Sequence, residues 1–279
     1  MAIDKRQRFE NSASYFACPI CQEPLDKVDN SLKCANNHTY DLSKFGYVNL
    51  LGGKKVDDHY SKASFENRKL ILENGFYDHI LKAVEEAVSQ YPEAKTLLDI
   101  GCGEGFYSRQ LLQTTDKEIL AFDISKDSVQ IAAKSDSTHR GKWFVSDLAK
   151  LPLQNGCADI ILDIFSPANY GEFKRVLSDR GYIIKVIPTA EHVKELRDKA
   201  SAQLNQKDYS NQKIIDHFKE HFDLVVQEEV TATNACSEKE RQAFIKMTPL
   251  LFNVDDSLID WTDVTELTVS ALVLIGKHK

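Results

Sequence analysis

A glycine-rich segment behind an apolar run constrains the fold of this chain more than any other feature. Leu98-Asp99-Ile100 is followed by Gly101, Gly103 and Gly105 at alternate positions. Glycines in this arrangement make a tight turn between a buried strand and a helix, and they let a ligand approach the backbone closely. A dinucleotide-binding loop places its third glycine one residue later, where this chain has Phe106, so the spacing disfavours NAD.

Apolar runs alternate with amphipathic stretches of helical length after this loop, which predicts an α/β fold. Strands that are apolar on both faces indicate a mainly parallel sheet covered by helices, with ligands outside the carboxyl ends of the strands. We expect seven strands, at Thr96–Ile100, Ile119–Ile124, Trp143–Val145, Ala158–Phe165, Tyr182–Ile187, Leu224–Val230 and Leu267–Ile275. Helices are expected near 107–112, 127–134, 170–177, 190–204, 212–220 and 238–246. The last two strands are expected to pair antiparallel at the sheet edge.

Acidic residues end three of the expected strands. Asp99 is placed to orient the glycine loop, and Asp123 follows it by 24 residues, where a carboxylate can accept hydrogen bonds from both ribose hydroxyls. Asp147, after the third strand, can receive the exocyclic amine of an adenine. The alternative is that the glycines form only a tight turn and the acids cap helices. Three acids in this order favour a nucleoside site built from them and the three glycines.

Four potential metal ligands stand near the N-terminus. Cys18 and Cys21, then Cys34 and His38, give the spacing C-x2-C-x12-C-x3-H. Two close pairs joined by a hairpin-length connection can place four donors tetrahedrally around one zinc ion, which predicts a closed structural site. Unmetallated thiols are the alternative, and a redox pair at Cys18 and Cys21 would not need the two downstream ligands.

Composition limits the class of protein. No apolar stretch approaches the length of a membrane span, and the N-terminal residues are too polar for a signal peptide, so we expect a cytoplasmic protein whose cysteines are thiols or metal ligands. The net charge is −7, but residues 1–55 carry +2 and residues 56–279 carry −9. Phosphates are therefore expected at the front of the molecule. We divide the chain into a zinc module at 1–51, a helical linker at 52–92 and a catalytic domain at 93–279.

The glycine loop with its strand-end acids resembles that of the class I S-adenosylmethionine-dependent methyltransferases, over about residues 93–275. The order of the motifs makes the resemblance more specific. In this order the motifs of the chain closely resemble those of the guanine-N1 methyltransferases of 23S ribosomal RNA. The motifs concerned are residues 16–21, Cys34 with His38, and residues 46–51, 74–77 and 99–105. The likeness covers nearly the whole chain. It departs at Lys246, because relatives usually have Gln before Met-Thr-Pro.

The resemblance implies a Rossmann-like methyltransferase domain, S-adenosylmethionine as cofactor and a bound zinc ion. It also implies that Tyr77, Gly103, Glu104 and His192 line the cofactor pocket, with Asp123 on the ribose, and that the zinc module helps to seat an RNA hairpin. Taken alone, Tyr77 is equally the first apolar residue of a helix, and His192 would more often be a surface histidine.

The linker offers candidate contacts to RNA. Basic residues can meet phosphate oxygens and aromatic residues can stack on exposed bases. The basic candidates are Lys54, Lys55, Lys62, Arg68 and Lys69, and the aromatic candidates are Tyr60, Phe65 and Phe76. The alternative, an ordinary amphipathic helix, is the more common meaning of this pattern.

The implied reaction moves a methyl group from a sulfonium to N1 of guanine. N1 carries a proton and lies in a base-paired edge, so the base must be unpaired and a proton acceptor is needed. Asp163, near the end of the fourth expected strand, is our candidate acceptor, although in so apolar a strand it can equally point away from the site. A homodimer is a further expectation, because two zinc modules can grip one hairpin.

Two other classes of function stay open from the sequence. One is a small-molecule methyltransferase that uses zinc only as a structural brace. The other is a non-catalytic RNA-binding protein that retains a cofactor pocket. Methyl transfer into isolated ribosomal RNA separates the first from the RNA enzyme, and cofactor binding without transfer identifies the second.

Overall fold

A computed structural model describes residues 4–52, 62–204 and 210–279 and contains an eight-stranded sheet. All seven expected strands are present, and an eighth, β4 (Tyr47–Asn49), joins them from the N-terminal segment. The methyltransferase domain thus supplies the seven expected strands, and the zinc module adds one that was not expected. The strand order is β10-β11-β9-β8-β5-β6-β7-β4. The other strands are β5 (Thr96–Ile100), β6 (Glu118–Asp123), β7 (Lys142–Val145), β8 (Ala158–Ile164), β9 (Leu177–Pro188), β10 (Phe222–Ala235) and β11 (Glu266–His278).

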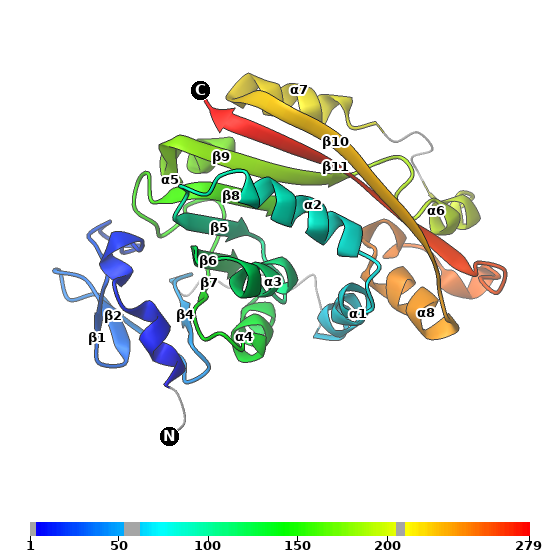
Figure 1. The fold of residues 1–279 in the computed structure, drawn as a ribbon. Helices are drawn as coiled ribbons and strands as arrows, with labels where there is room; N and C mark the ends of the chain where they lie inside the picture. Colours follow the sequence, from blue (N-terminus) through cyan, green and yellow to red (C-terminus); the bar gives the residue numbers. More distant parts are fainter. Residues whose placement is uncertain (1–3, 53–61, 205–209) are drawn as a thin grey trace.

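Six neighbouring strands, from β4 to β9, run parallel. β11 pairs antiparallel with both β9 and β10, so it lies between them and β10 forms the edge. The expected antiparallel pair at the edge is confirmed. In Figure 1 the long β10 and β11 extend beyond the parallel strands towards α8 (Glu238–Met247). The expected mainly parallel α/β sheet is likewise confirmed.

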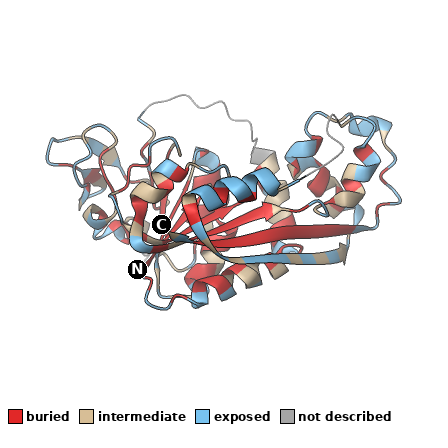
Figure 2. Ribbon diagram, turned by 90° about the horizontal axis from the view of Figure 1, so that it is seen from above, coloured by how far each residue is buried: buried red, intermediate tan, exposed pale blue. Residues whose placement is uncertain are grey.

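Alternate residues along each central strand point to opposite faces of the sheet and pack in two separate hydrophobic cores. Leu97 packs in the core that contains α2 (Asp78–Ser89), α3 (Phe106–Thr114) and α4 (Lys126–Ser135), whereas Leu98 packs on the opposite face. That second face is covered by α5 (Tyr170–Val176), α7 (Gln212–His221) and the N-terminal segment. The central strands are buried, while β10 alternates between partly and fully exposed residues (Figure 2).

The N-terminal segment packs directly on the large sheet. Its own small sheet contains β1 (Asp26–Val28), β2 (Ser31–Lys33) and β3 (Thr39–Asp41). Phe16 is fully buried, and its ring meets that of Phe144 edge-on at 5.2 Å between centroids. The two parts of the chain therefore share one hydrophobic core.

The linker forms α1 (Lys62–Glu73) and then leads into α2. α8 begins with a capping box between Ser237 and Glu240, and it packs against α1. The Phe76 and Phe244 rings lie 5.0 Å apart, and Asn74 Nδ2 donates to Glu240 at 2.7 Å. α6 (Lys194–Ala200) completes the helices. Within the described ranges, no helix combines the length and the apolar character that a membrane span requires.

Candidate cofactor pocket and zinc site

Three thiols and one imidazole of the N-terminal module converge on a common point. Nδ1 of His38 lies 3.4 Å from the Sγ atoms of Cys18, Cys21 and Cys34, and the sulfurs of Cys21 and Cys34 are 3.6 Å apart. A tetrahedral zinc ion with these ligands separates its donor atoms by roughly 3.5 to 3.8 Å. The donor set therefore fits one zinc ion in a closed structural site.

Two tight turns shape this site. Gln22 and Asn37, which follow the ligand Cys21 and precede the ligand His38, both have left-handed backbone angles, with φ of 64° and 62°. The Tyr40 hydroxyl lies 3.3 Å from Cys18 Sγ and so supports a ligand from outside the set. A hydrogen bond from the Asn36 side chain lowers the pKa of Cys21 to about 6, which favours the thiolate.

The three glycines of the loop are needed for two different reasons. All three have positive φ, at 64°, 56° and 75°. A Cβ at Gly101 would lie 2.4 Å from Ser166 Oγ, and one at Gly105 would lie 2.6 Å from the Trp143 ring, so internal packing excludes a side chain at both. A Cβ at Gly103 would meet only the Arg68 guanidinium, at 3.3 Å. At Gly103, therefore, only the end of a flexible side chain stands against the backbone, and that side chain can move for a ligand.

Asp99 ties the loop to the helix that follows. It is buried and accepts a hydrogen bond of 2.6 Å from Ser108 of α3. Burial raises the pKa of Asp99 to about 7. The carboxyl group thus holds the two ends of the loop together, as expected for a residue that orients it.

Asp123 and Asp147 lie at adjoining strand ends. Asp123 accepts from the backbone N–H of Gly103 at 3.0 Å and of Ser125 at 2.8 Å, so it fixes the glycine loop against the end of β6. Asp147 accepts from the Ala149 N–H at 2.8 Å. Both acids act as caps in the protein alone, and their roles toward ribose and adenine stay predictions.

A cavity of about 830 Å³ opens beside the loop, at the carboxyl ends of β8 and β9. This volume lies in the range of pockets for small molecules and cofactors. Tyr77 and His192, which the resemblance places at the cofactor, both line it. Met247, Thr248 and Pro249 form another part of the wall, so the Met-Thr-Pro motif belongs to the pocket.

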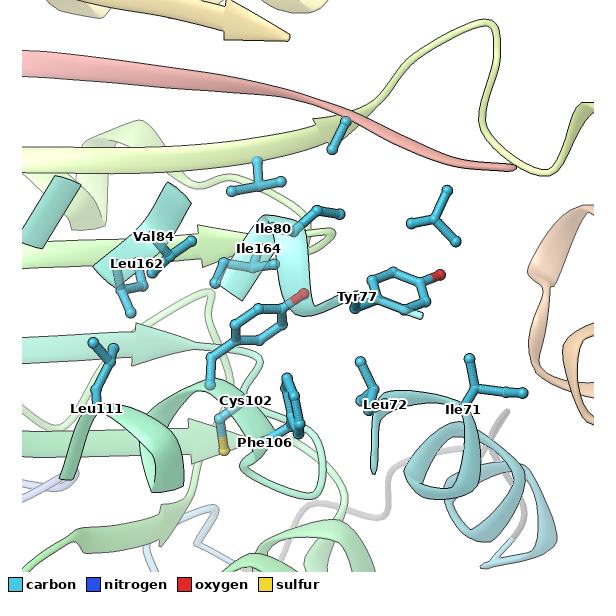
Figure 3. Close-up of a cluster of buried hydrophobic side chains, with 14 of the residues drawn as sticks. Ile71, Leu72, Tyr77, Ile80, Val84, Cys102, Phe106, Leu111, Leu162 and Ile164 are labelled. Atoms are coloured by element: carbon cyan, nitrogen blue, oxygen red, sulfur yellow. The ribbon is translucent and has the colours of Figure 1, made fainter. Parts of the chain in front are cut away.

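Tyr77, Phe165 and His192 form an aromatic group on one side of the cavity. The ring centroids of Tyr77 lie 6.0 Å from Phe165 and 6.1 Å from His192. Tyr77 belongs to the buried cluster with Leu72 of α1 and Ile164 of β8 (Figure 3). His192 Nδ1 lies 3.1 Å from the Ser270 carbonyl oxygen, and burial lowers the pKa of His192 to about 4. A neutral imidazole therefore faces the pocket at neutral pH.

Asp163 lies behind the wall of the cavity. It is fully buried, and its Oδ2 accepts from Lys185 Nζ at 2.5 Å. Lys185 of β9 lines the cavity, whereas Asp163 is not among the lining residues. Burial raises the pKa of Asp163 to about 6, and the lysine opposes this rise. The acid is therefore coupled to the pocket through Lys185.

Arg68 separates the cavity from the glycine loop. Its side chain lines the cavity, and its Nε lies 3.7 Å from Glu104 Oε1. Neither carboxylate oxygen of Glu104 has a hydrogen-bond partner within the described ranges, and the residue is 1% exposed. The sequence missed Lys185 and this role of Arg68, because both depend on which distant segments meet.

The structure does not support most of the RNA contacts that the sequence suggested for the linker. Phe76 is buried and does not line the cavity, so the prediction that it stacks on exposed bases is wrong, whereas Phe65, although buried, lines the cavity and stays a candidate. Lys69 stays a candidate and lies 3.7 Å from Glu73. Lys54, Lys55 and Tyr60 fall outside the described residues, as does the side chain of Lys62.

Two family models match this chain in the order of its parts. Residues 16–55 match a zinc ribbon described as "RlmA, N-terminal", and residues 97–181 match a methyltransferase domain. A solved complex between the Haloferax volcanii Trm112 methyltransferase activator and a methyltransferase contains a chain that is similar in fold, with a TM-score of 0.50 at 14% identity. That match covers 78% of this chain and 98% of the other.

Relatives of known name align over most of the chain. YxjB of Bacillus subtilis (strain 168), provisionally named a 23S rRNA (guanine-N(1)-)-methyltransferase, is 34% identical and covers 94% of this chain and 97% of its own length. The 23S rRNA (guanine(748)-N(1))-methyltransferase of Streptomyces fradiae is 31% identical, over 80% of this chain and 81% of its own. The zinc site, the glycine loop and this similarity together show that the chain belongs to the zinc-containing, S-adenosylmethionine-dependent 23S rRNA (guanine-N1)-methyltransferases.

Proposed function

We propose that this chain methylates N1 of one guanine in a hairpin of 23S ribosomal RNA. The observation that carries the proposal is a cavity lined by Lys185, the partner of Asp163, and by Arg68, which packs against the glycine loop. The loop and the strand-end acids supply the nucleoside site, with Gly103, Asp123 and Asp147 as its members. Bound S-adenosylmethionine supplies a methyl group that is already activated on a sulfonium, so catalysis needs mainly alignment and removal of one proton.

The cavity wall suits a base that has left its helix. Phe165 and Tyr170 line the cavity and offer aromatic faces on which a guanine can stack. Phe165 has a left-handed backbone with φ of 52°, which is strained for an aromatic residue. Its N–H donates to the Val186 carbonyl at 2.9 Å, so neighbouring β9 stabilises this conformation. The strained backbone of Phe165 therefore holds its ring in a fixed position at the cavity wall.

Lys185 and Asp163 serve the proton on N1 in this proposal. The lysine ammonium faces the guanine O6 and N1 edge and stabilises the anion that forms as the proton leaves. The proton passes to Lys185 while Lys185 gives one of its own to the Asp163 carboxylate, so the relay ends as a neutral acid. Asp163 is thus the terminal acceptor, reached through the lysine that lines the cavity.

The direct test is to map modified bases in ribosomal RNA from cells with and without this protein. We expect the loss of one N1-methylguanine in 23S RNA, restored by the intact gene and by purified, zinc-loaded protein acting on the unmodified RNA. Transfer into metabolites but not RNA would identify a small-molecule enzyme. Cofactor binding with no transfer to either would identify a binding protein, and both outcomes contradict the proposal.

The same proposal includes an RNA hairpin as the substrate, a homodimer as the active form and the cytoplasm as the location of the protein. The zinc module carries the positive end of the sequence, which suits phosphate oxygens, and two such modules could hold one stem. Light scattering of the protein with and without a short 23S hairpin measures the stoichiometry. A complex of two chains and one hairpin is expected, and one chain per hairpin would contradict the homodimer alone.

A further inference from the structure

We propose that Arg197 and Lys213 bind the two backbone phosphates that flank the target guanine, one phosphate each. The inference rests on the proposed function and deepens it, because it gives the RNA strand a binding site on the catalytic domain itself. Neither residue was a candidate from the sequence, whose charge balance favours the N-terminal module for phosphates.

The cavity wall has a charge opposite to that of the chain around it. Residues 56–279 carry a net charge of −9, yet the described residues that line the cavity include no Asp and no Glu. The cations of the wall are Arg68, Lys185, Arg197 and Lys213. A cleft lined by one sign of charge concentrates ligands of the opposite sign. The wall is therefore suited to a polyanion.

Two of the four cations already have a role, and two are free for a ligand. Lys185 forms the buried ion pair with Asp163, and Arg68 packs against the glycine loop. Among the described residues, no acid lies within ion-pair distance of Arg197 or Lys213. An uncompensated pair of cations at a cavity is the arrangement that phosphate oxygens require.

The end of β9 holds both cations at the cavity. The Arg197 guanidinium, on α6, donates to the Ala190 carbonyl and keeps further N–H groups for a ligand. Asn211 Nδ2 donates to the Pro188 carbonyl at 2.7 Å, so the first turn of α7 with Lys213 is tied to the same segment. Lys213 is exposed and Arg197 is partly exposed, so both meet solvent at the opening of the cavity.

The position of these cations favours the acceptor RNA over the methyl donor. β9 lies two strands away from β5, which carries the glycine loop, so the two strands are about 10 Å apart. A base that turns out of its helix enters a pocket by rotation about its backbone, so its phosphates stay outside the pocket. Cations at the opening beside β9 therefore fit the phosphates next to the guanine.

Neutral phosphates test this assignment on zinc-loaded protein with S-adenosylhomocysteine, the demethylated donor, present. Three hairpins carry the mapped guanine with a methylphosphonate on its 5′ side, on its 3′ side or on neither. The sugar before each linkage is 2′-deoxy in all three, because a 2′-hydroxyl would attack a methylphosphonate. The variants are Arg197→Met and Lys213→Met. The controls are Arg180→Met and Lys219→Met, at exposed positions of β9 and α7 that do not line the cavity.

Each variant should bind the unmodified hairpin more weakly and lose its sensitivity to one neutral linkage. We expect Kd from fluorescence anisotropy to rise by about fivefold to fiftyfold, the worth of a partly exposed charged hydrogen bond. The slope of log Kd against log salt should fall by about 0.7 to 0.9, as for one lost phosphate contact. The 5′ methylphosphonate should cause no further loss in one variant, and the 3′ methylphosphonate none in the other. The control variants should match the parent protein for all three hairpins.

Variants that keep the parent's sensitivity to both neutral linkages would overturn the assignment, because the cations would then act by general attraction. So would an unchanged Kd for the unmodified hairpin. A matching loss of S-adenosylhomocysteine affinity by calorimetry would also overturn it and would place the cations at the donor. Zinc content and unfolding midpoint confirm that each variant is folded. If the parent protein does not methylate the hairpin, the proposed function itself fails; if it does and neither variant couples to a linkage, only the phosphate contacts are refuted.

Discussion

Individual acids at the carboxyl ends of the strands have different roles because their hydrogen-bond partners differ. Asp99 holds a neutral donor, the Ser108 hydroxyl, whereas Asp163 holds the cation of Lys185. Asp123 accepts from backbone N–H groups. One residue type therefore provides a brace, an ion-pair partner and a loop anchor within a single region.

The pH dependence of methyl transfer should reveal Asp163. Burial raises its pKa to about 6, so the carboxylate that we propose as the proton acceptor is present above that pH and is lost as the pH falls through it. We expect kcat to rise with pH to a plateau, with a midpoint near 6. Asp163→Asn should lower kcat by about a hundredfold and remove this rising limb.

Single-turnover rates from pH 5 to 8 measure this effect at saturating RNA and donor. Asp223→Asn, at an exposed position of β10, is the control and should keep the parent profile. An Asp163→Asn enzyme with an unchanged midpoint near 6 would show that another group accepts the proton.

The sequence predicts single residues well where local spacing carries the information. The spacing of Cys18, Cys21, Cys34 and His38 is sufficient to identify four ligands, because short turns bring each pair together. No local pattern marks Lys185 as a site residue. It becomes one because the pairing of β8 with β9 places it beside Asp163.

Among the elements, β4 shows what an apolar pattern cannot predict. The longer strands other than β10 are recognisable because runs of apolar residues mark strands buried on both faces. β4 has only three residues, and it is a strand because β7 lies beside it, far along the chain. The helical pattern of α1 likewise did not reveal that α8 covers Phe76.

Phe16→Ala tests whether the zinc module and the sheet unfold as one unit. The ring is fully buried between Phe9 and Phe144, so its removal should lower the free energy of unfolding by about 3 to 5 kcal/mol. Urea unfolding should still show a single transition. Val28→Ala, at an exposed site on β1, should change stability by no more than about 0.5 kcal/mol. A separate early transition in the parent protein would contradict the shared core.

At the scale of the whole molecule, the zinc site and the proposed methyl-donor pocket lie in different regions, so loss of zinc and loss of donor binding should be separable. Cys34→Ala should release the ion and impair RNA methylation more than S-adenosylhomocysteine binding, because the glycine loop and cavity contain no zinc ligand. Metal analysis, calorimetry and methyl transfer to RNA measure the three effects. Cys236→Ala, outside the ligand set, should keep its zinc. Full metal content in Cys34→Ala would refute the ligand assignment.

The pairing of β4 with β7 also orders events during synthesis. The cysteines and histidine of the ribbon leave the ribosome first and can capture their ion, but Tyr47 and Val48 lack their parallel partner strand until Trp143 and Phe144 emerge. The nascent chain must carry an unfinished edge while residues 50–142 are made. Such a chain gains from a metal that stabilises the front of the protein while the remainder is still being made.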